Sequence, residues 1–328
     1  VPANRPTGQT LEGCQAVRQS DAEIFGVDTS SGKPVGELAL GQAHPNISFD
    51  DYKLIPYVNN SKLGLMARSP AHFLQAWQEP SESASEPFRF GRLVHAYILE
   101  PETFGDHYKT MPDFEVGIDS KRPKLTKEYK QLVSQWNEQN AGREAILPAD
   151  WTRLQDIRGV LHLKPRAQEY LRGGSRELTV CWQDQETGIK CKARLDSYQP
   201  EKRRIVDLKT SRDAAEFGKS IARFGYDRQA AFYKMGAEAV GLPVDEFCFV
   251  VVESDPIHGC ISAPLDRFTL RDGELQVRQL LRRLAECKRT GEFPTYLDPE
   301  TFKKPHWSFV FPEELTAHGR TAAAHSAA

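Results

Sequence analysis

Hydrophobic positions recur with two different spacings along this chain of 328 residues. Spacings of three and four residues are typical of amphipathic helices, and strict alternation is typical of half-buried strands. The first pattern predicts helices over 61–69, 70–77, 88–99, 126–138, 149–163, 213–222, 227–240 and 271–289. The second pattern, together with short β-branched runs, predicts strands over 177–182, 189–196, 204–209 and 247–253. This mixture favours an α/β fold with a mixed central sheet flanked by helices.

The two ends of the chain lack this periodicity. Residues 1–45 are rich in Gly, Ser, Thr and Pro, which predicts a flexible N-terminal arm. Residues 316–328 predict a disordered C-terminal tail, so the folded domain is expected over 46–315. The chain starts at Val1 rather than at a methionine, which is compatible with a piece of a longer protein.

Two neighbouring strands carry a constellation of charged side chains. Asp207 and Lys209 are two residues apart in a strand, so they share a face and stand about 7 Å apart. The segment 200–202 suits a turn, which predicts a hairpin that brings Asp196 to the same place at the edge of the sheet. Two carboxylates can hold Mg²⁺, and a lysine can stabilise the negative charge that develops on the phosphate during phosphodiester hydrolysis. The alternative is a surface ion pair on an edge strand.

Charge and cysteine content narrow the possible classes of protein. The net charge of −2 is less basic than is usual for a DNA-binding protein, but affinity depends on cations close to the phosphates. The six cysteines include no CxxC pair, which argues against a disulfide framework and an iron–sulfur cluster. The sequence has no visible signal peptide and no apolar run of about 18 residues, so we expect a cytoplasmic protein without a membrane segment.

Five ordered segments carry a resemblance to a known family: NSKLGLMARSPAHF at 60–73, GRLVHAYILEP at 91–101, KARLD at 192–196, DLKTS at 207–211 and FGYDRQAAFY at 224–233. On these segments the chain resembles the RecE (exonuclease VIII) nuclease family, within the PD-(D/E)xK superfamily that includes lambda exonuclease. The resemblance runs from about Ile47 to Phe311. It implies a restriction-endonuclease-like core with a mixed central sheet.

The resemblance also implies roles for individual residues. The implied catalytic residues are Lys209, Asp207, Asp196, Gln229 and Tyr233. The implied metal ligands are His95, Asp196, Asp207 and Glu177, with Mg²⁺ as the ion and Mn²⁺ as a substitute. Contacts to DNA are predicted for Arg68, Arg92, Lys192 and Arg194. The alternative for His95 and Tyr233 is a place in the core, and the alternative for exposed arginines is plain solvation.

The implied activity is a Mg²⁺-dependent exodeoxyribonuclease that starts at ends of linear double-stranded DNA. It would work processively from 5′ to 3′ and leave 3′ single-stranded tails for recombination by strand annealing. The implied partners are a RecT-like annealing protein and further copies of the chain in a tetrameric or trimeric ring, in a bacterial or prophage setting. The alternatives are a helicase-associated or CRISPR-adaptation-type nuclease, and a non-catalytic DNA-binding protein on the same scaffold.

Overall fold

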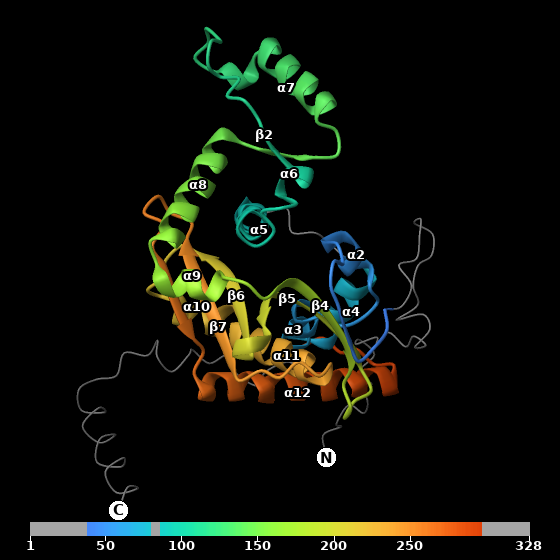
Figure 1. Cartoon of the computed structure of the whole chain (residues 1–328). Coiled ribbons are helices and arrows are strands. Elements are labelled where there is room, and N and C mark those ends of the chain that lie inside the picture. The colour runs from blue at the N-terminus through green and yellow to red at the C-terminus, as the bar shows by residue number, and fades with distance from the viewer. Residues whose placement is uncertain (1–37, 80–85, 297–328) are drawn as a thin grey trace, which may run out of the picture. The chain divides into compact units, whose positions relative to one another are not determined.

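A six-stranded sheet with the strand order β1-β4-β5-β6-β7-β8 is the centre of the fold. The computed structural model describes residues 38–79 and 86–296 (Figure 1). Neighbouring strands are antiparallel except for the parallel pair β6 and β7, so the sheet is mixed, as predicted. The strands of the sheet are β1 (Gln42–His44), β4 (Ser175–Gln183), β5 (Lys190–Gln199), β6 (Arg204–Ser211), β7 (Glu246–Glu253) and β8 (Cys260–Pro264). A separate parallel pair is formed by β2 (Tyr108–Thr110) and β3 (Glu144–Ile146).

Helices cover both faces of the sheet (Figure 1). The helices are α2 (Phe49–Leu54), α3 (Asn60–Arg68), α4 (Pro70–Gln78), α5 (Glu86–Leu99), α6 (Phe104–His107), η1 (Pro123–Leu125), α7 (Lys127–Gln139), α8 (Pro148–His162), α9 (Pro165–Leu171), η2 (Pro200–Lys202), α10 (Phe217–Phe224), α11 (Tyr226–Ala239) and α12 (Arg267–Thr290). No described helix combines the length and apolar character that crossing a bilayer requires.

On one face, α3, α4, α11 and α12 enclose the larger apolar core. Helix α11 can lie directly on the sheet because it presents Gly236 to Trp182, where an added Cβ would come within 2.5 Å of the indole ring. Helix α12 crosses α11 just as closely, since a Cβ at Gly273 would lie 2.2 Å from the carbonyl oxygen of Asp227. These two contacts fix α11, and α11 carries side chains of the candidate site.

On the other face, α5, α8 and α9 pack against a second apolar core. The sheet contributes Val206 and Leu208 from β6 to this core, together with alternate residues of β7. Strict alternation therefore sends Asp207 and Lys209 to the opposite side of β6, as predicted. Helix α5 lies over β6 on this face and brings its polar residues near the centre of the sheet.

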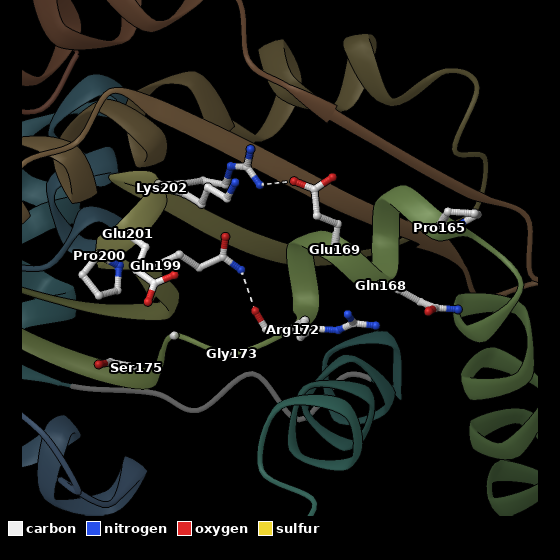
Figure 2. Close-up of a pocket in the computed structure, with 12 residues that line it drawn as sticks. Pro165, Gln168, Glu169, Arg172, Gly173, Ser175, Gln199, Pro200, Glu201 and Lys202 are labelled. Carbon is white, nitrogen blue, oxygen red and sulfur yellow. Dashed lines mark hydrogen bonds and ion pairs between the residues drawn. The ribbon is translucent and has the colours of Figure 1, made fainter.

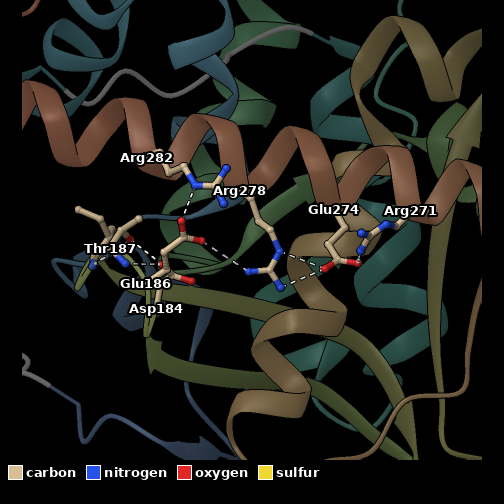
Figure 3. Close-up of polar contacts among 8 residues, drawn as sticks. Asp184, Glu186, Thr187, Arg271, Glu274, Arg278 and Arg282 are labelled. Carbon is tan, nitrogen blue, oxygen red and sulfur yellow. Dashed lines mark hydrogen bonds and ion pairs between the residues drawn. The ribbon is translucent and has the colours of Figure 1, made fainter.

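Long-range charge pairs join α12 to the turn between β4 and β5 (Figure 3). Arg282 and Arg278 both face Glu186, with a distance of 3.9 Å between Arg278 Nη1 and Glu186 Oε2. Arg278 also pairs with Glu274 on the same helix at 3.0 Å. Because these side chains are exposed to water and to screening by salt, each pair contributes little to the stability of the fold.

Most predicted elements are confirmed with ends shifted by a few residues, including the antiparallel hairpin of β5 and β6. Three features differ. Residues 42–44 of the predicted arm form β1 and pair with β4, while 1–37 and the tail 316–328 lie outside the described residues. Helix α10 begins at Phe217 rather than at 213, because Asp213 and Glu253 bind backbone amides of the preceding turn. The sequence patterns also did not predict α2, α6, η1, α9, β2, β3 and β8, all of which are short.

Candidate active site

The candidate site lies in a gap between β5 and β6. The described ladder between these strands ends at the pair Ser197 and Val206, one step before Asp196 would face Asp207. Beyond it, the amide of Leu208 donates to Asp196 Oδ2 at 2.8 Å instead of to a backbone carbonyl. The expectation of a site at the sheet edge is therefore wrong, because β5 and β6 are interior strands that part from each other here.

A second irregularity lies across β5, in β4. Glu177 has a positive φ of 50°, a left-handed conformation that is uncommon for residues other than glycine, and the β4–β5 ladder skips its pairing with Asp196. On β5, Leu195 and Tyr198 enter the same apolar core although they are three residues apart, which strict alternation does not allow. In both strands the side chains therefore change from one side of the sheet to the other at Glu177 and Asp196. Such distortions are typical of functional sites in sheets.

Donor atoms for a metal ion converge at this irregularity. The candidate ligand atoms of His95, Glu177 and Asp196 all lie within 4.8 Å of one another. Helix α5 supplies His95, and its Nδ1 is 3.4 Å from Asp196 Oδ2. Two carboxylates and one imidazole from three elements suit a divalent cation such as Mg²⁺ or Mn²⁺. The structure thus brings together three of the four predicted metal ligands.

The electrostatics of the site fit a cation as well. Burial raises the pKa of Asp196 to about 8, and the neighbouring charge of Asp207 adds to this effect. Burial also raises the pKa of Glu177 to about 7, with a further contribution from Asp196. Burial and the charge of Lys209 lower the pKa of His95, which keeps its imidazole neutral and able to act as a ligand. The protein therefore holds more carboxylates here than its own cations neutralise.

The fourth predicted ligand, Asp207, is completely buried and is held by two side chains. Its Oδ2 forms an ion pair with the Lys209 ammonium, and its Oδ1 accepts a hydrogen bond of 3.1 Å from Gln229 Nε2 on α11. Burial opposes the charge of Lys209, but Asp207 and Asp196 outweigh this effect and raise its pKa. Lys209 is therefore a permanently charged donor beside the carboxylates.

Two tyrosines of α11 complete the surroundings. Tyr233 lies one turn after Gln229, interacts with its side chain and feels the charges of Asp207 and Asp196. Tyr226 was not among the predicted site residues, and its ring centre is 5.1 Å from the Lys209 ammonium nitrogen. The available signal was its spacing, because Tyr226 lies three residues before Gln229 and so on a neighbouring position of the helix face.

Two of the predicted DNA contacts have other partners in the structure. Lys192 is buried, and its ammonium donates to the carbonyl oxygens of Tyr52 and Ile55, both at 2.6 Å. Arg194 is also buried, and it pairs with Glu177 and donates to the carbonyl oxygen of Ile47. Neither side chain can reach a phosphate without leaving these partners, so the expected DNA contacts of Lys192 and Arg194 are corrected to structural contacts.

The other two predicted DNA contacts lie on the surface. Arg68 is exposed at the end of α3. Arg92 is exposed on α5, and its guanidinium is 3.8 Å from Glu144. Contacts of both residues with DNA remain predictions.

Arg194 is expected to control metal affinity through Glu177. Its guanidinium also lies 3.6 Å from Glu100, so it ties Glu177 to the end of α5. We expect Arg194→Met to weaken Mn²⁺ binding about 10- to 100-fold, as the loss of partners behind a metal ligand usually does. Arg194→Lys should recover part of this loss, because it keeps the charge but not the forked geometry. The measurement is titration calorimetry with Mn²⁺.

Arg204→Met is the matched control for this experiment. Arg204 is also a largely buried arginine of the hairpin and pairs with Glu246 at 2.5 Å, but it lies at the far end of β6. Unchanged Mn²⁺ affinity in Arg194→Met, or an equal loss in Arg204→Met, would contradict the positioning role of Arg194.

A separate cavity of about 640 Å³ lies at the turn between β5 and β6 (Figure 2). Its walls include Glu169 and Arg172 from the α9 region, and Gln199 and Lys202 from the turn. Gln199 donates to the carbonyl oxygen of Arg172 at 3.1 Å, which ties the two walls together. Gln199 is three residues, or about 10 Å of strand, beyond Asp196. This cavity therefore does not contain the carboxylate cluster.

Comparison with known proteins agrees with this fold. Residues 60–301, well over half of the chain, match the family described as a PDDEXK-like domain of unknown function (DUF3799). The chain belongs to this family. The recognition of a PD-(D/E)xK protein from the five segments is therefore confirmed. The matched region contains every predicted site residue.

One solved structure supports the same fold. A candidate exonuclease from Eubacterium rectale is similar over 84% of this chain and 99% of its own chain, at 16% identity and a TM-score of 0.53. A phage-related exonuclease from Haemophilus somnus matches 53% of this chain and 91% of its own, at 15% identity and a TM-score of 0.24. No curated protein matches the chain. At this identity the first likeness shows the fold alone, and the predicted PD-(D/E)xK fold is confirmed.

Proposed function

We propose that this protein is a Mg²⁺-dependent exodeoxyribonuclease that degrades linear double-stranded DNA. The observation that carries the proposal is the convergence of His95, Glu177 and Asp196 next to the Asp207–Lys209 pair. A site of buried acids with one charged amine suits hydrolysis of a phosphodiester, in which negative charge develops on phosphate oxygens. Membership of a PDDEXK-like family supports the same chemistry.

Some residues of the site would hold the ion, and others would stabilise negative charge on the substrate. His95, Glu177, Asp196 and Asp207 would hold Mg²⁺ or Mn²⁺. When bound, such an ion acts as a Lewis acid and makes a coordinated water more acidic. These ligands are supported from behind by Arg194, which pairs with Glu177.

Lys209 and Gln229 act on the substrate side of the same site. Because the pKa of Lys209 is raised, its ammonium stays protonated and can donate to a phosphate oxygen or to the attacking water, but it cannot accept a proton. Gln229 keeps Asp207 Oδ1 in place through its amide. Tyr233 restrains Gln229 in turn.

The finer activity follows the resemblance to RecE-type nucleases. We propose that the enzyme digests processively from 5′ to 3′ and leaves a 3′ tail that a RecT-like annealing protein receives. We also propose a ring-like homo-oligomer, either a tetramer or a trimer, in a bacterial or prophage-encoded recombination system. The mass of the native protein in solution tests the ring, and co-purification with an annealing protein tests the partner.

The proposed activity is tested with linear and covalently closed circular duplex DNA. Each substrate is incubated with the wild-type protein and Mg²⁺, with EDTA, and with Asp207→Ala. We expect degradation of the linear DNA alone, only with Mg²⁺ and only when Asp207 is present. Early release of a 5′ label and retention of a 3′ label would give the polarity. Cutting of the circle would point to an endonuclease, and binding without cutting to a non-catalytic protein.

A further inference from the structure

The corner between α10 and α11 carries an exposed aromatic ring. Phe224 ends α10 and is 54% exposed, and Gly225 then takes a positive φ of 67° that turns the chain into α11. Single exposed apolar residues are common on protein surfaces and need no explanation by themselves. The contacts of Phe224 with its neighbours are what distinguish it.

Phe224 is the outer member of a row of rings that leads to the candidate site. Its ring centre is 5.7 Å from that of Tyr226. The ring of Tyr226 in turn lies 5.1 Å from the Lys209 ammonium nitrogen. Phe224 is thus separated from the proposed catalytic lysine by a single side chain. If a phosphate of a nucleic-acid strand binds at Lys209, Phe224 is the exposed ring of this row that a neighbouring base can reach.

Cationic groups surround the exposed ring. The guanidinium of Arg223 lies 5.4 Å from the ring centre of Phe224. Both residues line a cavity of about 540 Å³ that also includes Arg68 and Arg228. Among the described residues, neither Arg223 nor Arg228 has a carboxylate oxygen within ion-pair distance. An aromatic face flanked by arginines is the combination that binds single-stranded nucleic acid without regard to its sequence.

The backbone around Arg228 is shaped to hold its guanidinium. A Cβ at Gly64 would come within 2.5 Å of Arg228 Nη2, and a Cβ at Gly225 within 2.6 Å of Nη1. Arg228 Nε donates to Asn60 Oδ1 at 3.2 Å, which fixes the plane of the group. The guanidinium is therefore preorganised between α3 and α11, at the cavity that Phe224 also lines.

The cavity also has an acidic side, whose two carboxylates accept hydrogen bonds from one amide group. Asp227 and Asp272 line it, and the amide of Gln276 donates to a carboxylate oxygen of each at 2.7 Å. These two carboxylates are engaged with α12. Arg223 and Phe224 are exposed at the same cavity and can face a ligand.

We propose that Phe224 stacks on a base of the strand whose phosphate lies at Lys209, and that Arg223 and Arg228 contact the adjoining phosphates. The proposal rests on the proposed nuclease activity and names the part of the substrate that this corner binds. Stacking on a ring accepts all four bases, which suits an enzyme that digests DNA of any sequence. Phe224 thereby positions the strand, and the carboxylates and Lys209 carry the chemistry.

The test uses single-stranded oligonucleotides with 2-aminopurine at successive positions, bound to the full chain in EDTA so that no cleavage occurs. Stacking on a protein ring quenches the fluorescence of this base. We expect Phe224→Leu to abolish quenching at one or two adjacent positions and to weaken binding about 5- to 150-fold, the range for one stacked base. Phe224→Trp should retain both. Because Phe224 is exposed, none of these changes should unfold the protein.

Phe268 supplies a matched control. It is 72% exposed on α12 and also lies beneath an arginine, since the Arg267 guanidinium is 4.8 Å from its ring centre. No ring contact among the described residues joins it to Lys209. Phe268→Leu should therefore leave quenching and affinity unchanged. Wild-type quenching in Phe224→Leu, or equal losses in both variants, would overturn the proposal.

The arginines are tested through the salt dependence of binding. Each phosphate contact contributes about 0.7 to the slope of log affinity against log salt concentration for single strands. Arg223→Gln should reduce the slope by about this amount, and Arg267→Gln should not. If the wild type cleaves no DNA with Mg²⁺, the nuclease proposal fails whatever these binding results are. If cleavage occurs but Phe224→Leu binds normally, only the stacking proposal fails.

Discussion

Replacing Lys209 with alanine is expected to reduce the rate of DNA cleavage at least about 100-fold while metal binding persists. The reason is that the ammonium pairs with Asp207 and donates no ligand atom to the cluster of His95, Glu177 and Asp196. Its loss removes charge stabilisation in the transition state and leaves every candidate ligand in place. Single-turnover cleavage at saturating Mg²⁺ measures the rate, and calorimetry with Mn²⁺ measures the binding.

Lys209→Ala is also expected to change the stability of the protein, and this change distinguishes a role of the charge from a purely structural role. Asp207 is fully buried, so removal of its partner should destabilise the metal-free protein by about 3–5 kcal/mol. A bound cation replaces the lost positive charge, so the metal should stabilise Lys209→Ala more than the wild type. Turnover like that of the wild type would refute the catalytic role, and loss of metal binding would make Lys209 a structural residue instead.

The central part of the site was predictable from local sequence because strands and helices have fixed periods. Alternation along 204–209 places Asp207 and Lys209 on one side of β6, away from Val206 and Leu208, and the structure has them there. A turn at 200–202 sets the hairpin that brings Asp196 close. The spacing of four residues likewise put Gln229 and Tyr233 on one side of α11.

Alternation fails where the two strands of the site are distorted. Glu177 adopts a positive φ, and the side chains of β4 and β5 change sides at this point. No local propensity predicts a left-handed glutamate, because only the surrounding structure can hold it there. The sequence therefore suggested Glu177 by resemblance alone, although its position in the register opposite Asp196 would have supported the assignment.

Lys192 and Arg194 were predicted to contact DNA, and their burial corrects this prediction. Lys192 and Arg194 alternate with Cys191, Ala193 and Leu195 of the larger apolar core, so the predicted period of two is confirmed here. Segments distant in sequence cover them, since Lys192 binds carbonyl groups at the end of α2 and Arg194 binds Glu177, Glu100 and Ile47. A period of two tells which residues share a face, but it cannot tell whether water or another element covers that face.

The stability of the metal-free protein is expected to fall as pH rises from about 4 to about 8. Asp196 has its pKa raised from 3.8 to about 8 by burial and by Asp207, so the folded protein keeps a proton that the unfolded chain releases near pH 4. Within this window the free energy of unfolding falls as the pH rises, and below pH 4 the full contribution is present. Glu177 adds to the fall between 4.5 and about 7.

A divalent cation reverses this trend, because it binds the ionised carboxylates and so stabilises the folded state more at pH 8 than at pH 6. The measurement is the Tm with Mg²⁺ and with EDTA across this pH range. In Asp196→Asn the side chain cannot ionise, so the metal-free variant should lose less stability on going to pH 8 than the wild type. The variant should also lose most of the Mg²⁺-dependent rise in Tm. Its cleavage rate should fall by more than the 10- to 100-fold that is typical of losing an outer partner of a ligand.

Asp150→Asn is the control for the loss of stability that follows from replacing any buried acid. Asp150 is also buried, but it pairs with Arg89 and Arg153, which already neutralise it. Its replacement should lower stability between pH 6 and pH 8 and leave the metal-dependent rise in Tm intact, because no cation is needed there. A metal effect that survives in Asp196→Asn, or that disappears in Asp150→Asn, would place the ion outside the gap between β5 and β6. Metal binding would then not explain why the carboxylates in this gap lie close together.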